Sequence, residues 1–391
     1  MSTVLKDPIL ELVDELEVPR SSYETAVRRY EDLGRWLHDP AKARSAAHRP
    51  EVRAQGSFRL GTAIKPIRGE HYDLDLVCKL LDGVSLTTHT QAQLTEMLGA
   101  DLDAYRRERG IVKPLEEKNR CWRVEYMDEI AFHLDALPAI PHSVVRQKQL
   151  SDLMVREGLV STEAAALSRH ALAITDRRLP NYRLIDRDWP TSNPEGFAQW
   201  FEGRMRLSPA ALQKRALVEA VASIEQLPTY RWKTPLQGAI QLLKRHRDVM
   251  FLDQPDSKPI SAIITMLAAM AYQGEDEVQT ALTGVLARMA GAVRPARPRV
   301  PNPVNPAEDF ADKWATSEGQ KLQLEKNFFD WVEQAVADVE LLSQASGRRL
   351  YDLAREKLRI ELGRLKNEPA QPATTRVQVI QPAGSPRPWC A

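Results

Sequence analysis

The stretch that decides the fold reads Gly56-Ser57-Phe58-Arg59-Leu60-Gly61-Thr62, followed by His71-Tyr72-Asp73-Leu74-Asp75-Leu76-Val77. In the second segment, two aspartates stand two residues apart inside an apolar run. Because such residues in a strand point to the same face, Asp73 and Asp75 are expected on one side, with the apolar residues on the other. Two like charges held this close favour a divalent cation between them, and oxygen ligands with substrate phosphates suit magnesium. A solvated edge strand with two surface acids is the alternative interpretation.

A third carboxylate stands in a later apolar run. Residues 129–138 read Glu-Ile-Ala-Phe-His-Leu-Asp-Ala-Leu-Pro, so a single aspartate, Asp135, interrupts the strand. A lone acid in a buried strand is costly unless it is paired or binds a metal. If this strand lies beside the one at 72–80, three carboxylates meet, as a two-metal phosphoryl-transfer centre requires. His133 shares their face and is either a structural histidine or a substrate contact.

The Gly-Ser turn before the first aspartates is suited to phosphate. Gly56 has no Cβ, so the backbone can come close to a ligand, and the Ser57 hydroxyl with nearby amides can hold phosphate oxygens. Taken alone, a Gly-Ser pair is a weak signal. Its distance from the Asp-x-Asp pair, together with the later strand aspartate, makes the combination specific.

Composition excludes several classes of protein. The chain of 391 residues has 54 Lys and Arg against 53 Asp and Glu, and the net charge of +1 gives no general attraction to nucleic acid or membranes. No stretch approaches the roughly 18 apolar residues of a membrane span. Cys78, Cys121 and Cys390 are far apart, which indicates reduced thiols of a cytoplasmic protein rather than disulfides or a zinc cluster.

Hydrophobic periodicity divides the chain into a mixed α/β part and a helical part. Residues 8–47 read as helices, and a polar helix is expected near 90–109. Short β-rich runs lie at 72–80, 121–127 and 129–138. Beyond about residue 142 the pattern predicts helices at 145–156, 161–173, 195–206, 209–225, 235–250, 259–273, 277–290, 318–345 and 348–365.

Four parts follow from this pattern. The N-terminal helices over 1–48 are expected to pack on both lobes, 49–185 form the catalytic core, and 186–366 form a helical lobe. Residues 367–391 hold five prolines and few large apolar side chains, so they are expected to be a disordered tail.

Together, Gly56-Ser57, Asp73-x-Asp75 and Asp135 resemble the nucleotidyltransferase fold of the DNA polymerase beta superfamily. Over roughly residues 20–350 the chain resembles the bacterial cGAS/DncV-like nucleotidyltransferases, the synthases of cyclic oligonucleotide second messengers in anti-phage (CBASS) defence. One departure from the superfamily pattern is Gln55, where many members have a second glycine. The resemblance is carried by the segments 55–62, 72–77, 133–140, 189–198, 235–248, 258–265, 302–306 and 310–314.

The resemblance implies an α+β fold and a metal centre. A polymerase-beta-like lobe with a mixed sheet would be followed by a C-terminal helical lobe, with the active site in the cleft between them. Asp73 and Asp75 would bind two Mg²⁺ or Mn²⁺ ions. Asp135 would bind the catalytic ion and help to activate the attacking hydroxyl.

The resemblance also implies a set of nucleotide contacts. Gln55, Gly56 and Ser57 would contact the phosphates of bound nucleotide. Lys244 and Ser261 would contact the donor triphosphate, which needs cations beyond the metals. Ser261 is read alternatively as a helix N-cap.

Two further groups each allow two interpretations. Arg245 and Arg247 are read equally as functional residues and as basic residues that complement the dipole at a helix end. Four of the eight tryptophans are read as core residues in preference to stacking platforms for bases. They are Trp189, Trp200, Trp232 and Trp314.

The resemblance therefore predicts a cyclic oligonucleotide synthase that uses NTPs (ATP, GTP or both, with pyrimidine NTPs also allowed) and releases pyrophosphate. A linear 2′–5′ or 3′–5′ oligonucleotide synthase, or another nucleotidyltransferase, would use the same residues. An inactive nucleic-acid sensor is the alternative from a different class, and the near-zero net charge argues against it. No membrane and no obligatory nucleic acid are expected as partners. An accessory CBASS regulator, or an enzyme that conjugates the C-terminus at Ala391, is implied.

Overall fold

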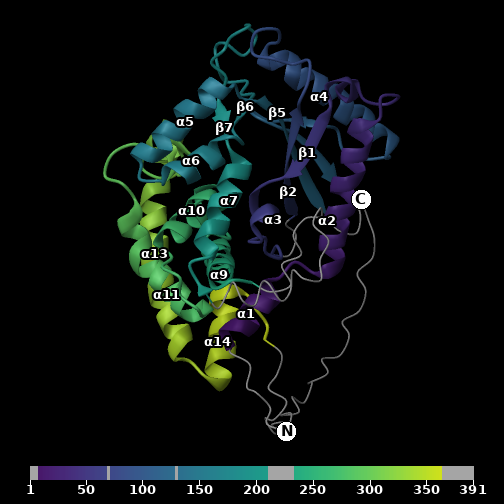
Figure 1. The fold of residues 1–391 in the computed structure, drawn as a ribbon. Coiled ribbons are helices and arrows are strands. Elements are labelled where there is room, and N and C mark those ends of the chain that lie inside the picture. The colour runs from purple at the N-terminus through teal and green to yellow at the C-terminus, as the bar shows by residue number, and fades with distance from the viewer. Residues whose placement is uncertain (1–7, 68–70, 128–130, 210–232, 363–391) are drawn as a thin grey trace, which may run out of the picture.

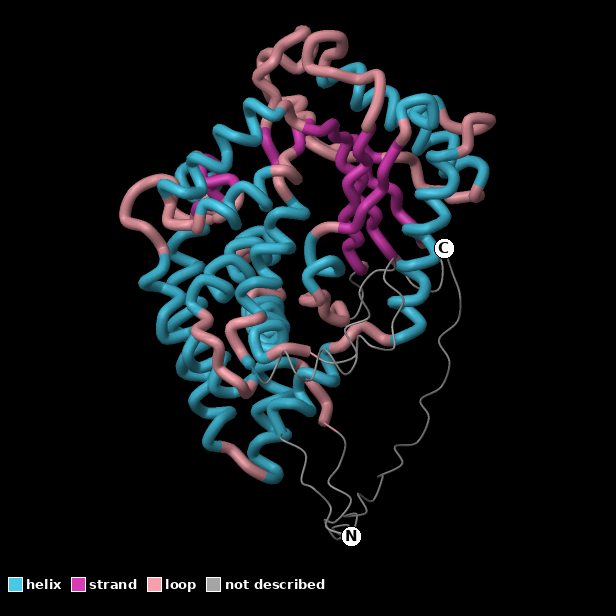
Figure 2. The backbone as a smooth tube through the Cα atoms, viewed as in Figure 1, coloured by secondary structure: helices cyan, strands magenta, loops and turns pink. Residues whose placement is uncertain are grey.

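The computed structural model describes residues 8–67, 71–127, 131–209 and 233–362 (Figure 1). It has a mixed β-sheet in one part and a bundle of helices in the other, and Figure 2 shows the strands gathered in the first part. This is the α+β fold that the sequence predicts. The tail from 363 lies outside the described residues, so its conjugation at Ala391 stays a prediction.

The main sheet has seven strands in the order β1-β2-β5-β4-β3, with β6 paired to the end of β5 and β7 paired to β6. Neighbours run antiparallel except β2 and β5, which are parallel. The strands are β1 (Pro50–Ala54), β2 (Tyr72–Leu80), β3 (Glu116–Glu117), β4 (Trp122–Tyr126), β5 (Phe132–Pro141), β6 (Leu172–Ile174) and β7 (Thr191–Ser192). A separate two-stranded sheet joins β8 (Pro301–Asn302) to β9 (Asn305–Asp309).

The helices that surround the sheet or join its strands are α2 (Arg20–His38), the 3₁₀ turn η1 (Arg44–His48), α3 (Gly56–Leu60), α4 (Gln91–Glu108), α5 (Val144–Arg156) and α6 (Ser161–Ser168). The N-terminal helix α1 (Pro8–Leu16) packs instead in the second part.

The second part contains the remaining helices. They are α7 (Pro194–Met205), α9 (Pro235–Met250), α10 (Ser261–Ala271), α11 (Val278–Met289), α12 (Ser317–Lys321), α13 (Leu324–Gln344), α14 (Gly347–Leu358) and the 3₁₀ turns η2 (Pro255–Ser257), η3 (Ala290–Ala292) and η4 (Asp312–Ala315).

Most expected elements are present, and three differ, among them the helix expected over 348–365, which ends at Leu358. The helix expected over 161–173 ends at Ser168, because residues 172–174 form β6 on the end of β5. The helix expected over 318–345 is divided into α12 and α13. The helix expected over 209–225 lies almost wholly outside the described residues.

One face of the sheet is apolar and packs against α2 and α4, which lie on the side of the sheet away from the helical bundle (Figure 1). Leu74 and Leu76 of β2 and Leu134 of β5 are at most 1% exposed there. Because successive strand residues alternate between faces, the polar residues between these leucines must point the other way. The core of this part therefore fixes which side chains share the opposite face.

Helix α9 lies at the centre of the helical part, and α1, α10, α11, α13 and α14 pack against it (Figure 1). Every residue from Pro235 to Arg247 is buried. Trp189, Trp200 and Trp314 are at most 7% exposed, as a core role predicts, whereas Trp232 lies outside the described residues. None of the described helices is long and apolar enough to span a lipid bilayer.

Candidate active site

The register of the sheet brings the polar side chains together in two rows. β2 and β5 pair so that Asp75 stands opposite Asp135, and β5 and β4 pair so that Asp135 stands opposite Arg123. Two residues away on each strand lies a second row on the same face. The second row consists of Asp73, His133 and Glu125. Strand pairing thus places the three expected carboxylates on neighbouring positions of one sheet face.

Asp135 is paired with an arginine that the sequence interpretation missed. Arg123 donates from Nε to Oδ1 and from Nη2 to Oδ2 of Asp135, both over 2.7 Å. The same guanidinium lies 3.9 Å from Oδ1 of Asp73. The hydrogen bonds to Asp135 raise the pKa of Arg123 above its usual range. Asp135 is therefore not a lone acid, because the neighbouring strand supplies its counter-charge.

Asp75 lies in the most unfavourable electrostatic position of the three carboxylates. Burial, and then the charges of Asp135 and Asp73, raise the pKa of Asp75 to about 7. Among the described residues, none donates a hydrogen bond to this carboxylate. A divalent cation between the aspartates would relieve both the burial and the repulsion, and hard carboxylate oxygens are the donors that such an ion takes. Asp73, with a side chain 62% exposed, leaves the group open to solvent. These observations fit a divalent-metal site.

The Gly-Ser turn lies directly against this group. Gly56 has a positive φ of 62°, and a Cβ at this position would come within 2.3 Å of Asp75 Oδ2. The amide of Gln55 donates to the backbone carbonyl of Asp75 over 2.8 Å. Ser57 is the second residue of α3, and its carbonyl accepts from the amide of Thr62 over 2.9 Å. The turn and the aspartates are thus one local structure, and only glycine fits between them.

Lys244 reaches the same region from the helical part. Its Nζ donates to the carbonyl of Thr62 over 3.0 Å and to the Thr62 hydroxyl over 3.2 Å. Burial, and then the charge of Arg247, lower the pKa of Lys244 to about 7, although Asp248 and Asp75 act in the opposite direction. The ammonium therefore belongs to the electrostatic surroundings of Asp75, and it is held at the end of the loop that follows α3.

Ser261 lies at the start of α10 and, unlike Lys244, makes no hydrogen bond to the chain after α3 among those that the structure describes. It is the first residue of α10, the N-cap is Ile260, and the Ser261 hydroxyl accepts from Nη1 of Arg247 over 3.0 Å. Arg247 also donates to the carbonyl of Pro259, and Arg245 donates to a backbone carbonyl of the chain after α3. Both buried arginines therefore donate to backbone carbonyls outside α9, and Arg247 also lies in the last turn of the helix, where its charge complements the dipole. No described hydrogen bond or ion pair connects Ser261 directly with the aspartates.

Comparison with known proteins agrees with this site. Residues 50–138 match the family model described as "Cyclic GMP-AMP synthase DncV-like, nucleotidyltransferase domain". That range contains the Gly-Ser turn and all three aspartates.

The similarity to individual proteins extends over most of the chain. A c-di-GMP synthase of Roseivirga ehrenbergii is 28% identical over 357 residues, which are 88% of this chain and 81% of the relative. The cyclic dinucleotide synthase CdnG of Bradyrhizobium diazoefficiens is 26% identical over 332 residues, which are 80% of this chain and 71% of the relative. The solved structure of that CdnG in complex with GTP superposes with a TM-score of 0.60 at 20% identity, covering 90% of this chain and 94% of that chain. The chain is therefore similar to the bacterial cGAS/DncV-like nucleotidyltransferases, in its nucleotidyltransferase domain over residues 50–138 and, at lower identity, over most of its length.

Proposed function

We propose that this nucleotidyltransferase makes a cyclic dinucleotide from NTPs, with GTP as a substrate. The observation that carries the proposal is the alignment of Asp73, Asp75 and Asp135 on one sheet face beside the turn at Gly56. Two relatives named as cyclic dinucleotide synthases, one of them a c-di-GMP synthase, support this choice of product and base.

The three aspartates would hold two Mg²⁺ ions. When bound, these ions neutralise phosphate charge and lower the pKa of the attacking hydroxyl. Asp75, with its pKa of about 7, must be deprotonated before it can serve as a ligand. Arg123 donates to both oxygens of Asp135, so it would have to give up at least one of them when a metal ion binds this carboxylate.

The chain around α3 would hold the triphosphate. Gly56 lets the backbone approach the ligand, while Gln55 and Ser57 offer polar groups beside Asp75. Lys244 keeps the following loop in place through Thr62 and adds positive charge near the phosphates. Ser261, in contact with Arg247, would act from the helical part. Positioning and charge neutralisation supply most of the rate in such reactions.

The test is an analysis of products. Purified protein is incubated with Mg²⁺ and each α-³²P-labelled NTP alone, then with all four together, and the products are treated with phosphatase and identified by mass spectrometry. A phosphatase-resistant cyclic dinucleotide that contains guanine is the expected result. A labelled product that phosphatase degrades would identify a linear polymerase, and a cyclic product without guanine would overturn the choice of substrate.

A further inference from the structure

A second group of ligand-type side chains lies beside the aspartates on the same face of the sheet. Glu125 of β4 and His133 of β5 stand directly opposite each other. His71 directly precedes β2, two residues before Asp73, so its side chain follows the same face. In the sequence, this arrangement corresponds to three pairs of polar residues, one pair for each of three neighbouring strands. The two members of each pair are separated by a single residue. The pairs are His71 with Asp73, Arg123 with Glu125, and His133 with Asp135.

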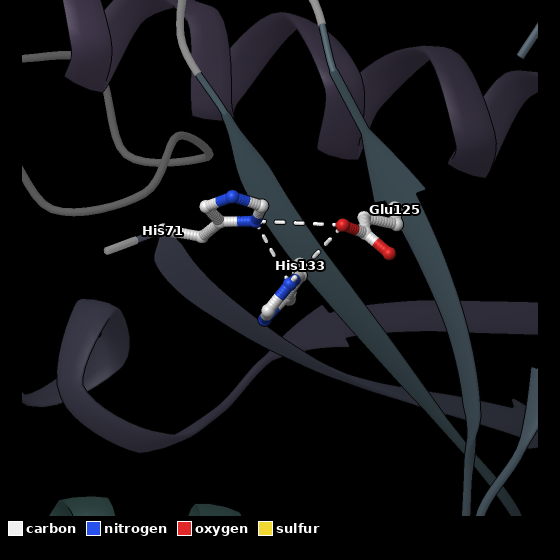
Figure 3. A group of neighbouring side chains, drawn as sticks. All are labelled: His71, Glu125 and His133. Carbon is white, nitrogen blue, oxygen red and sulfur yellow. Dashed lines mark hydrogen bonds and ion pairs between the residues drawn. The ribbon is translucent and has the colours of Figure 1, made fainter. Parts of the chain in front are cut away.

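The three side chains converge on one point (Figure 3). Nδ1 of His71 lies 2.8 Å from Nε2 of His133, and each of these nitrogens lies 3.8 Å from Oε1 of Glu125. A triangle with sides of 2.8, 3.8 and 3.8 Å has its centre about 2 Å from every corner, which is the length of a zinc–imidazole or zinc–carboxylate bond. The three atoms lie close to the ligand spacing of a small transition-metal ion, and tetrahedral coordination would require the two imidazole nitrogens to separate by about 0.5 Å.

We propose that His71, Glu125 and His133 form a binding site for a divalent transition-metal ion such as Zn²⁺, separate from the oxygen-only centre of the aspartates. Two imidazoles and one carboxylate favour zinc, whereas Mg²⁺ prefers oxygen ligands alone. Three protein ligands leave a fourth position of the tetrahedron open. The three side chains are between 21% and 23% exposed, so an ion and a water molecule can reach the site from solvent.

The surroundings of His133 support coordination through Nε2. Its other ring nitrogen, Nδ1, lies 3.3 Å from Oδ1 of Asp73. Metal-bound histidines commonly donate the second N–H to a carboxylate, which fixes the tautomer and orients the ring. An ion at this site would therefore hold Asp73 in place through His133. Lys113 competes with the ion for Glu125, because its Nζ lies 3.5 Å from Oε1 of this carboxylate. The ion must bind either in place of this ammonium or beside it.

A metal-free alternative exists and gives a different experimental result. Two neutral imidazoles at 2.8 Å can share one hydrogen bond without any ion, with Glu125 as a nearby acceptor. In that case the group has no special affinity for transition metals. Measurement of metal binding distinguishes the two cases directly, and it requires no turnover of nucleotide, so its outcome is independent of the proposed activity.

The test uses Co²⁺ as a spectroscopic substitute for Zn²⁺ on chelator-treated, full-length protein without a histidine tag. We expect one equivalent of Co²⁺ to give the visible d–d absorption of a tetrahedral site, to persist in excess Mg²⁺ and to be displaced by Zn²⁺. His71→Ala and the isosteric Glu125→Gln should each weaken Co²⁺ binding at least tenfold. His89→Ala, which removes a histidine whose ring lies 6.5 Å from that of His48, is the matched control and should bind Co²⁺ normally.

Three results would overturn the proposal. The first is the absence of tetrahedral absorption in the wild-type protein. The second is unchanged Co²⁺ affinity in Glu125→Gln, whose far-ultraviolet circular dichroism shows that it is folded. The third is loss of the Co²⁺ absorption in Asp75→Asn with its retention in His71→Ala, which would assign the ion to the aspartates.

Discussion

At the scale of single residues, the close approach of Gly56 to Asp75 restricts the choice of amino acid at position 56 to glycine. Gly56 combines a positive φ with a space that a Cβ cannot occupy, because the Asp75 carboxylate fills it. Gly110 has nearly the same φ, 66°, but a Cβ there would meet nothing within 4 Å. An alanine at either position therefore strains the backbone, but only an alanine at Gly56 would also displace the Asp75 carboxylate.

We expect Gly56→Ala to lower the rate of nucleotidyl transfer about 100-fold, because it pushes the Asp75 carboxylate, a proposed metal ligand, out of place. Gly110→Ala should carry the same backbone strain of about 1–2 kcal/mol and keep its activity. The measurement is product formation under saturating NTP and Mg²⁺, with the stability of both variants determined by urea unfolding. Equal activity losses in the two variants would show that strain, and not displacement of Asp75, is the cause.

In the proposed metal centre, Arg123 would compete with the metal for Asp135. Its guanidinium occupies both carboxylate oxygens, which are the atoms a metal would use. We expect Arg123→Met to lose about 1–3 kcal/mol of stability without metal, since three carboxylates are left to repel one another. The same variant should reach its half-maximal Mg²⁺-induced rise in Tm at a lower Mg²⁺ concentration than the wild type.

Arg120→Met is the control for that experiment, because Arg120 pairs with Asp176, outside both rows of side chains. Its Mg²⁺ requirement should equal that of the wild type. A higher Mg²⁺ requirement in Arg123→Met would mean that the arginine supports metal binding instead of opposing it.

The pKa of Lys244 gives a prediction about pH. Folding lowers this pKa from 10.5 to about 7, so between these values the unfolded chain binds a proton that the folded chain does not. The contribution of Lys244 to the stability of the wild type therefore rises with pH across this window, by up to about 1.4 kcal/mol per pH unit. Lys244→Met lacks this dependence, so its stability relative to the wild type should be greatest at pH 7 and fall towards pH 10.

Urea unfolding at several pH values measures this effect. Gln237→Met is the matched control, because Gln237 is a buried, uncharged residue of the same helix that donates to the carbonyl of Leu60. Its stability difference from the wild type should not change between pH 7 and 10. A flat difference for Lys244→Met as well would show that Lys244 keeps its ordinary pKa in the folded protein.

At the scale of elements, one side of α9 fixes the chain that follows α3. Gln237, Gln241, Lys244 and Arg245 recur at helical spacing, and each donates to a backbone carbonyl between residues 60 and 65. The sequence predicted α9 with its bounds and identified Lys244 as a cation, but not the carbonyls that it contacts. Those partners lie about 180 residues away in the chain, and periodicity carries no information about them.

A second connection between elements joins α3 to α7. Arg59 donates to Glu202 over 2.8 Å and to Glu195 over 3.1 and 3.3 Å, and all three side chains are largely buried. We expect Arg59→Met to lower the free energy of unfolding by about 1–3 kcal/mol, because it leaves Glu195 without its ion-pair partner and Glu202 with only the exposed Arg206, 3.9 Å away.

Arg183→Met is the comparison for this prediction, since its ion pair with Glu96 is exposed, at 77% and 64%. Its cost should stay within about 0.5 kcal/mol. Urea unfolding measures both variants, and equal costs would refute a structural role for the α3–α7 connection.

At the scale of the whole molecule, the sequence predicted the α+β class, the three aspartates and most helices of the second part. These predictions were possible because the patterns lie within short stretches of sequence. The spacing of Asp73-x-Asp75 places both side chains on one face of a strand, and helices such as α9 repeat apolar residues at fixed intervals. Arg123, His71 and Glu125 were missed because their importance depends on which strands become neighbours. Only the order β2-β5-β4 places them beside the aspartates.

The most direct test of the account compares nucleotide turnover in Asp75→Asn with turnover in Asp330→Asn, which changes an exposed aspartate of α13. Both variants are incubated with labelled GTP, the other NTPs and Mg²⁺, and phosphatase-resistant product is measured. The account predicts that Asp330→Asn forms product like the wild type, whereas Asp75→Asn forms none above background while remaining folded. Undiminished product from Asp75→Asn would contradict the assignment of the catalytic site to the aspartates of the sheet.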